Sequence, residues 1–181
     1  MLKKVLSLFQ DTPHKDAEDL YAMIVAQARQ PAFYTHYGVP DTVDGRFEMI
    51  VLHMCLLSHR LQGGQPAKAP TTPLGQSIFD LFIKDMDACL RELGAGDMGV
   101  GHRIKAMAQG YYGRTANYSE CFEDRQQDLP AAIKKNVYGT CTQDKAKELS
   151  KYCLKSIEHL QEIKLDTVIN IKVLFPSVEI K

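Results

Sequence analysis

The chain has 181 residues, 45% of them hydrophobic, which is enough for one globular domain with a substantial core. Its 22 basic and 22 acidic side chains give a net charge of zero, which argues against the basic field of a nucleic-acid-binding protein. Five cysteines without a CxxC pair indicate reduced thiols in a cytosolic-type compartment. No apolar run approaches the roughly 20 residues of a membrane span, and the N-terminus lacks the features of a secretory signal.

The first part of the chain predicts helices. Leu2 to Phe9 form a short apolar stripe beside two lysines, which predicts either a turn docked on the core or a contact with an anionic bilayer surface. Thr12 starts an amphipathic helix that Pro31 ends. From about Gly45 to Leu61 apolar residues cover several sides, which predicts a central helix.

His53 lies within that apolar segment. A buried histidine with satisfied ring nitrogens is one interpretation, and a ligand or catalytic role is the other. The following stretch, Gln62 to Pro73, is rich in glycine, proline and threonine, which predicts a mobile loop within one domain.

The segment from Ile78 to Arg114 is expected to organise the fold. It reads as two helical arms joined by a glycine-rich hinge, Gly94 to Gly101. Apolar residues on two flanks of the first arm predict burial on both. Asp97 is the expected N-cap of the second arm.

Three more helices are expected after Arg114: one over Thr115–Arg125, one from Asp128–Pro130 to near Gly139, and a long last one that follows a capping-box pattern at Thr140 and Gln143. From Thr167 the sequence VINIKVLF is typical of a strand. The expected fold is therefore all-α: a single-domain bundle over residues 1–181 with about six to seven helices and a short extended C-terminal segment.

Charged residues near the loop before the central helix and along the two arms are candidates for binding a partner. They are Asp41, Asp44, Arg46, Asp80, Asp85, Asp87, Arg91, Arg103, Lys105 and Arg114. Alternatively, some of them pair among themselves and only fix the helix packing. That subset is Asp44, Arg46, Asp85 and Arg114.

Catalytic motifs are absent from the sequence. There is no GxxxxGK[ST], HExxH or GxSxG, and the clustered glycines follow a helix rather than a strand, which excludes a phosphate loop. Carboxylates of the first arm could join His53 or Glu48 in a metal site, but the Glu-x-x-His pairs of di-metal bundles are missing. We therefore expect no metal or cofactor. The alternative function is a metal- or haem-binding helical protein that uses His53 and the carboxylates of Asp80, Asp85 and Asp87.

Three blocks carry a family resemblance: YGVPDTVDGRFEMIVLHMCLLSHRL at 37–61, FDLFIKDMDACLRELGAGDMGVGHRIKAMAQGYYGR at 79–114, and TANY at 115–118. They resemble the ubiquinol-cytochrome c chaperone family, the assembly factors for cytochrome b of respiratory complex III. The resemblance covers about residues 20–122, and residues 131–181 are treated as a C-terminal extension.

The resemblance implies a non-catalytic, all-helical protein without a cofactor that binds newly made cytochrome b or its nascent chain. Mitochondrial members act with a small partner protein near the ribosomal exit tunnel. Because the chain has no Arg- and Ser-rich presequence, it is similar to a bacterial member, expected in the cytoplasm and peripheral at the inner face of the plasma membrane. The ribosome and a small partner protein are further candidate partners, without direct nucleic-acid recognition. Replacing Asp85 or Arg114 is expected to lower complex III while leaving the protein folded.

Overall fold

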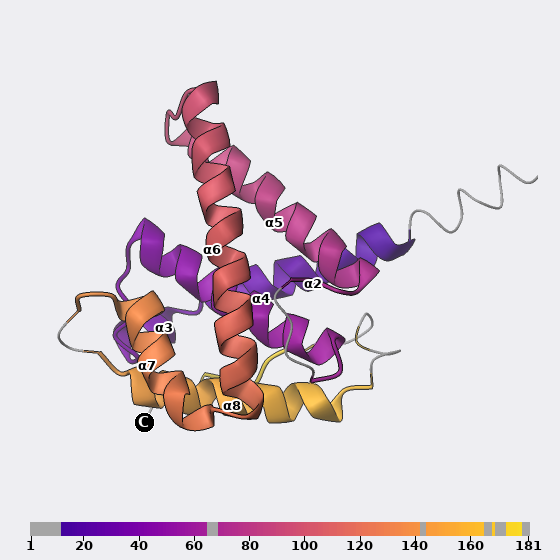
Figure 1. Cartoon of the computed structure of the whole chain (residues 1–181), viewed down its shortest axis with the longest axis vertical. Coiled ribbons are helices and arrows are strands. Elements are labelled where there is room, and N and C mark those ends of the chain that lie inside the picture. Colours follow the sequence, from indigo (N-terminus) through magenta and orange to yellow (C-terminus); the bar gives the residue numbers. More distant parts are fainter. Residues whose placement is uncertain (1–11, 65–68, 142–143, 165–167, 169–172, 179–181) are drawn as a thin grey trace, which may run out of the picture.

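The computed structural model describes residues 12–64, 69–141, 144–164, 168 and 173–178, and every regular element within them is helical (Figure 1). The expected all-α, single-domain class is confirmed. In chain order the elements are α2 (Thr12–Ala28), α3 (Pro31–Thr35), α4 (Val43–Leu61), α5 (Pro73–Glu92), α6 (Asp97–Glu123), the 3₁₀ turn η1 (Gln126–Asp128), α7 (Leu129–Ile133), the π-helical turn η2 (Lys134–Tyr138) and α8 (Ala146–Glu162). No helix in these ranges is both long and apolar enough to cross a bilayer.

Helix α4 lies at the centre of the protein and packs against α2, α6 and α8. Every residue from Glu48 to His59 is buried, which agrees with its apolar pattern on several sides. Thr42 begins the helix, because its hydroxyl accepts a hydrogen bond from the Gly45 amide at 3.1 Å. A helix surrounded in this way is the main source of the core.

Helices α5 and α6 pack against each other and extend together away from the rest of the protein (Figure 1). Near the core, Ile78 and Phe82 of α5 are buried. At the far end, Leu93 is 65% exposed and Met98 is 93% exposed. The prediction that the first arm is buried on both flanks is therefore wrong for its outer end, which projects beyond the core. The sequence pattern shows how apolar a face is but not how far the neighbouring helices reach.

Helix α6 is longer than the sequence suggested. Its N-cap is Gly96, so Asp97, the expected cap, is instead the first helical residue. The helix continues to Glu123 without a break, and the separate helix expected from Thr115 is wrong. No proline interrupts the segment, and the buried face formed by Tyr111 continues through Tyr118.

The C-terminal third completes the core. The helical segment expected between Asp128 and Gly139 is confirmed as α7 followed by η2, and α7 packs on α8. The N-cap of α8 is Lys145, without a side-chain cap bond, and residues 142–143 of the expected capping-box region lie outside the described residues. Beyond α8, Leu174 and Phe175 are buried against the core.

Three other predictions also fall wholly or partly outside the described residues. The apolar stripe at residues 2–9 lies entirely outside them. The expected strand covers residues 167 and 169–172, and the expected mobile loop covers residues 65–68, none of which is described.

Candidate partner-binding cleft

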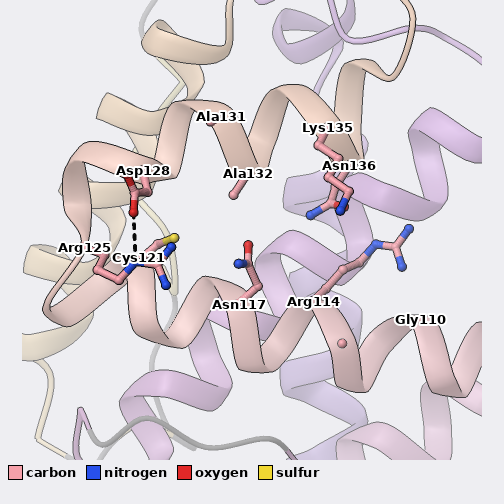
Figure 2. A pocket seen from close by; sticks show the side chains of 11 residues that line it. Gly110, Arg114, Asn117, Cys121, Arg125, Asp128, Ala131, Ala132, Lys135 and Asn136 are labelled. Carbon is pink, nitrogen blue, oxygen red and sulfur yellow. Dashed lines mark hydrogen bonds and ion pairs between the residues drawn. The ribbon is translucent and has the colours of Figure 1, made fainter.

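A cleft of about 640 Å³ lies between α6 and the segment formed by η1, α7 and η2 (Figure 2). We refer to it as the α6–α7 cleft. Its lining residues are Gly110, Gly113, Arg114, Asn117, Cys121, Arg125, Asp128, Ala131, Ala132, Lys135 and Asn136.

Small side chains keep this cleft open. Gly110, Gly113, Asn117 and Cys121 follow one another at intervals of three or four residues, which places them on one face of α6. The opposite wall is formed by α7, and Figure 2 shows the side chains of Asn117 and Ala132 pointing toward each other between the two walls. A Cβ atom added at Gly113 would meet nothing within 4 Å. The cleft therefore has room for a segment of another chain to approach the backbone of α6 closely.

Arg114 borders the cleft and is held by a carboxylate of α4. Its Nε donates to Oε2 of Glu48 at 2.6 Å, and its Nη2 donates to Oε1, so the pair is bidentate. The guanidinium also lies 5.9 Å from the centre of the Phe47 ring. A Cβ atom at Gly110 would lie 2.7 Å from Arg114 Nη1, so this glycine makes room for the guanidinium.

Glu48 is only 7% exposed. Burial raises the pKa of its carboxyl group, while the hydrogen bonds from Arg114 lower it, and burial is the larger effect. Arg114 is therefore part of the helix packing as well as part of the cleft.

The two ends of the cleft carry different polar groups. At one end Arg125 Nε donates to Asp128 Oδ2 at 2.8 Å, the contact dashed in Figure 2. At the other end Lys135 and Asn136 lie near Arg114 (Figure 2). Arg114 lies within α6, whereas Arg125 lies just beyond its end, before η1. The cleft thus offers cationic and amide groups at intervals along an otherwise small-residue surface.

Cys121 is the one thiol among the lining residues of this described cleft. Burial raises its pKa, so the group stays a protonated thiol near neutral pH. The acid beside it, Asp128, is paired with Arg125. A protonated thiol without a base is a poor nucleophile, and this arrangement is suited to contact rather than to covalent chemistry.

Two of the predicted binding residues form an ion pair at the start of α4. Arg46 Nε lies 2.6 Å from Asp41 Oδ1, and both side chains are about half exposed. The Arg46 guanidinium carbon lies 5.3 Å from the centre of the Tyr34 ring. The hydrogen bond that Arg46 donates to the Asp41 carboxylate raises the pKa of Arg46. This pair lies outside the α6–α7 cleft.

The three aspartates of the first arm do not form one site. Asp85 accepts a hydrogen bond from the Tyr21 hydroxyl at 2.8 Å and lines a shallow groove between α2 and α5. Asp80 accepts one from Gln76 on the exposed side of α5. Asp87 pairs with Arg91 at 2.6 Å near the outer end of the arm.

Arg91 also pairs with Asp97, so it joins the end of α5 to the start of α6. Arg103 and Lys105 are exposed on the projecting part of α6 and form no ion pair within the described part of the chain. Asp44 is exposed in the first turn of α4. The roles of all these residues in partner binding remain predictions.

The predicted pairing of Asp44, Arg46, Asp85 and Arg114 with one another is wrong. Of these, Arg46 binds Asp41, Asp85 binds Tyr21, and Arg114 binds Glu48. Periodicity shows which side of a helix a residue occupies, but it does not show which residue of another helix it faces.

Of the ten predicted binding residues, only Arg114 lines the α6–α7 cleft. The sequence reasoning missed Asn117, Lys135 and Asn136. The spacing of Gly110, Gly113 and Asn117 along one helix face was the signal that could have revealed one wall. Nothing local indicated that η2 would supply the other.

His53 is a structural residue of the core. It is fully buried, and its Nδ1 lies 2.7 Å from the Met49 carbonyl oxygen while its Nε2 lies 2.9 Å from the Tyr152 hydroxyl. Because a carbonyl only accepts, Nδ1 carries the proton and Nε2 accepts from Tyr152. Burial lowers the pKa of His53 to about 4, so the ring stays neutral. Both nitrogens are occupied, which argues against the ligand role considered from the sequence.

No group of three or more His, Cys, Asp or Glu side chains among the described residues is arranged to hold a metal ion. The alternative function would need His53 and the aspartates of α5 in one place. Instead, each of these aspartates contacts a different partner, and His53 bonds to α4 and α8.

Comparison with known proteins identifies the family. A model of the ubiquinol-cytochrome C chaperone family matches residues 35–175. The chain belongs to this family. The match to this chaperone family extends well beyond the blocks recognised in the sequence and includes α7, η2 and α8.

The chaperone is also similar to the crystal structure of the Cbp3 homolog from Brucella abortus. The sequence identity is 33%, the TM-score is 0.82, and the alignment covers 98% of this chain and 97% of the other. A comparison with curated proteins found no match. The family relationship therefore rests on a sequence model and on a whole-chain structural match.

Proposed function

We propose that this chaperone is a non-catalytic assembly factor that binds newly made cytochrome b during the biogenesis of ubiquinol-cytochrome c reductase, complex III of the respiratory chain. The observation that carries the proposal is the family match across residues 35–175. The whole-chain similarity to the bacterial Cbp3 homolog supports it.

The α6–α7 cleft is the surface we propose for the client. A segment of a membrane protein is largely apolar, and it must be held without a large exposed apolar patch that would cause the chaperone itself to aggregate. Glycine and alanine walls allow close packing of a helix, and Asn117, Lys135 and Asn136 offer hydrogen bonds at its edges. These groups can bind a helical segment and release it later.

The first experiment is affinity capture. The tagged chaperone is purified from membranes of its source organism, and the co-purifying proteins are identified. Cytochrome b without mature complex III subunits is the expected result. A deletion strain with normal complex III levels, or capture without cytochrome b, would contradict the proposed function.

A pair of matched variants tests the cleft separately. Gly113→Leu fills the cleft, whereas Gly101→Leu changes an exposed glycine on the same helix outside it, and a Cβ atom at either position meets nothing within 4 Å. Both variants should fold, since leucine is a better helix former than glycine. Gly113→Leu should lower cytochrome b capture by roughly tenfold while Gly101→Leu does not. Equal capture by the two would reject this cleft but leave the chaperone function intact.

We also propose that the protein acts in the cytoplasm, peripherally at the inner face of the plasma membrane, with the ribosome and a small partner protein as further contacts. The reason for this location is the proposed client, because cytochrome b is a membrane protein and its chaperone must meet it at the membrane. Cell fractionation with a high-salt wash tests it, because a peripheral protein should leave the membrane fraction in salt. The same affinity capture would reveal ribosomal proteins or a small partner.

A further inference from the structure

A second concave site lies between α8, the end of α3 and the segment that follows α8. It has a volume of about 360 Å³. We refer to it as the α3–α8 pocket. Its lining residues are His36, Tyr37, Lys145, Glu148, Lys151, Tyr152, Lys155, Pro176 and Ser177. None of them lines the α6–α7 cleft.

Positive charge is concentrated in this pocket, although the whole chain has a net charge of zero. Three lysines line it against a single carboxylate, that of Glu148. Lys145 Nζ donates to the carbonyl oxygen of His36, which holds the ammonium group at the pocket. The nearby acid Asp144 does not neutralise it, because Lys134 Nζ lies 2.9 Å from Asp144 Oδ2.

Positive charge also follows one face of α8. Lys151 and Lys155 are one turn apart, a spacing at which like charges repel. Lys151 is exposed and forms no ion pair within the described residues. An anion bound at Lys151 would offset its positive charge.

The floor of the pocket is rigid. The Tyr152 ring is buried, and its hydroxyl accepts a hydrogen bond from Gln27 Nε2 at 2.9 Å while it also contacts His53 Nε2. The Tyr37 ring packs against it edge to face, with centroids 6.4 Å apart. The lysines therefore project from a fixed frame, and an anion bound by them would not need to order the pocket first.

The chemistry of the cations indicates the kind of anion. Ammonium groups act as point charges and are common phosphate ligands, whereas guanidinium groups bind carboxylates and phosphates in a bidentate way. The pocket has lysines and no arginine. Its volume falls within the range of small-molecule sites.

We propose that the α3–α8 pocket binds the phosphate group of a small phosphorylated ligand of the nucleoside phosphate class. Lys145, Lys151 and Lys155 surround the phosphate, and the partly exposed faces of Tyr37 and Pro176 contact the remainder of the ligand. This site is independent of client capture in the α6–α7 cleft.

Isothermal titration of the full chain at low ionic strength, with pyrophosphate and with ATP as probes, tests the proposal. Lys151→Gln should weaken binding by about tenfold. Glu148→Gln removes the one carboxylate of the pocket and should tighten binding. Lys147→Gln is the matched control, because it removes the same charge one turn away on α8 at a residue that does not line the pocket.

The direction in which each variant changes the binding affinity decides the outcome. Weaker binding by Lys151→Gln, tighter binding by Glu148→Gln and no change in Lys147→Gln would support the site. Binding only to vesicles that contain phosphatidic acid, with the same pattern among the variants, would support the phosphate chemistry and assign it to a lipid headgroup. Absence of binding to all probes, or equal weakening by Lys147→Gln and Lys151→Gln, would overturn the proposal.

Discussion

The bidentate pair between Arg114 and Glu48 should be important for stability as well as for the cleft. Replacing Arg114 by alanine leaves the Glu48 carboxylate in a position where it is only 7% exposed, without its hydrogen-bond donors. Removing one partner of a fully buried ion pair costs about 3–5 kcal/mol. Because the Arg114 side chain is 24% exposed, water can reach the vacated site, and we expect a loss of about 2–3 kcal/mol. In a chain of this size that corresponds to a decrease in Tm of about 5–10 °C.

The loss should depend on pH. Burial already raises the pKa of Glu48 above its ordinary value of 4.5, and Arg114 opposes that rise. Without Arg114 the folded-state pKa rises further above the unfolded value, so the folded protein binds a proton more readily than the unfolded chain. The contribution of Glu48 to the free energy of unfolding is then favourable at low pH, and it is lost as the pH rises through the folded-state pKa. The deficit of Arg114→Ala should therefore be smaller at about pH 5 than at about pH 7.5.

Urea unfolding followed by circular dichroism measures this deficit at both pH values. Arg125→Ala is the matched control, because Arg125 lines the same cleft just beyond the end of α6 but forms exposed ion pairs with Asp128 and Glu120. It should leave Tm nearly unchanged. Adding Glu48→Gln to Arg114→Ala should recover about 1 kcal/mol, because it removes the unpaired charge. A wild-type Tm for Arg114→Ala, or an equal deficit at the two pH values, would refute this reasoning.

This prediction differs from an expectation drawn from the sequence. Arg114 was expected to be replaceable without loss of folding, so that any fall in complex III would report on client binding. Arg114 also neutralises a buried carboxylate. Its replacement could therefore lower complex III either through reduced stability or through reduced client binding, and the two causes would not be distinguished. Gly113→Leu is the better functional variant, because it changes the cleft without removing a buried contact.

Three further predictions concern packing and reactivity. Leu56→Ala should lower the free energy of unfolding by about 2–5 kcal/mol because Leu56 is fully buried in α4, whereas Leu93→Ala, at a position 65% exposed, should have little effect in the same urea titration. Gly45→Ala would place its Cβ atom 2.0 Å from a backbone carbonyl oxygen and should lower Tm, whereas Gly113→Ala meets no atom and should maintain or raise it. Burial raises the pKa of Cys55 to about 12, so this thiol should react with Ellman's reagent only on unfolding; rapid labelling of Cys55 in the folded protein would contradict its burial.

Many features of the fold could be predicted from the sequence, because they depend on interactions between residues that are close along the chain. Thr42 at the start of α4 and the prolines that bound α2 set helix ends through capping and the missing amide hydrogen. The apolar positions on several sides of α4 required that it be surrounded. Family blocks at 37–61 and 79–118 indicated the chaperone family, and the match over residues 35–175 confirms it.

Only the tertiary structure decided which side chains meet. Glu48 and Arg114 are 66 positions apart, and no local pattern distinguishes their pairing from the pairing of Arg114 with another acid. The α6–α7 cleft likewise needs the continuous helix α6 and the turn η2 to be placed opposite each other. The sequence determined the helices and their apolar faces because these depend on neighbours three or four residues away. The ion pairs and clefts depend on how distant helices pack, which is set by the sum of all contacts in the core.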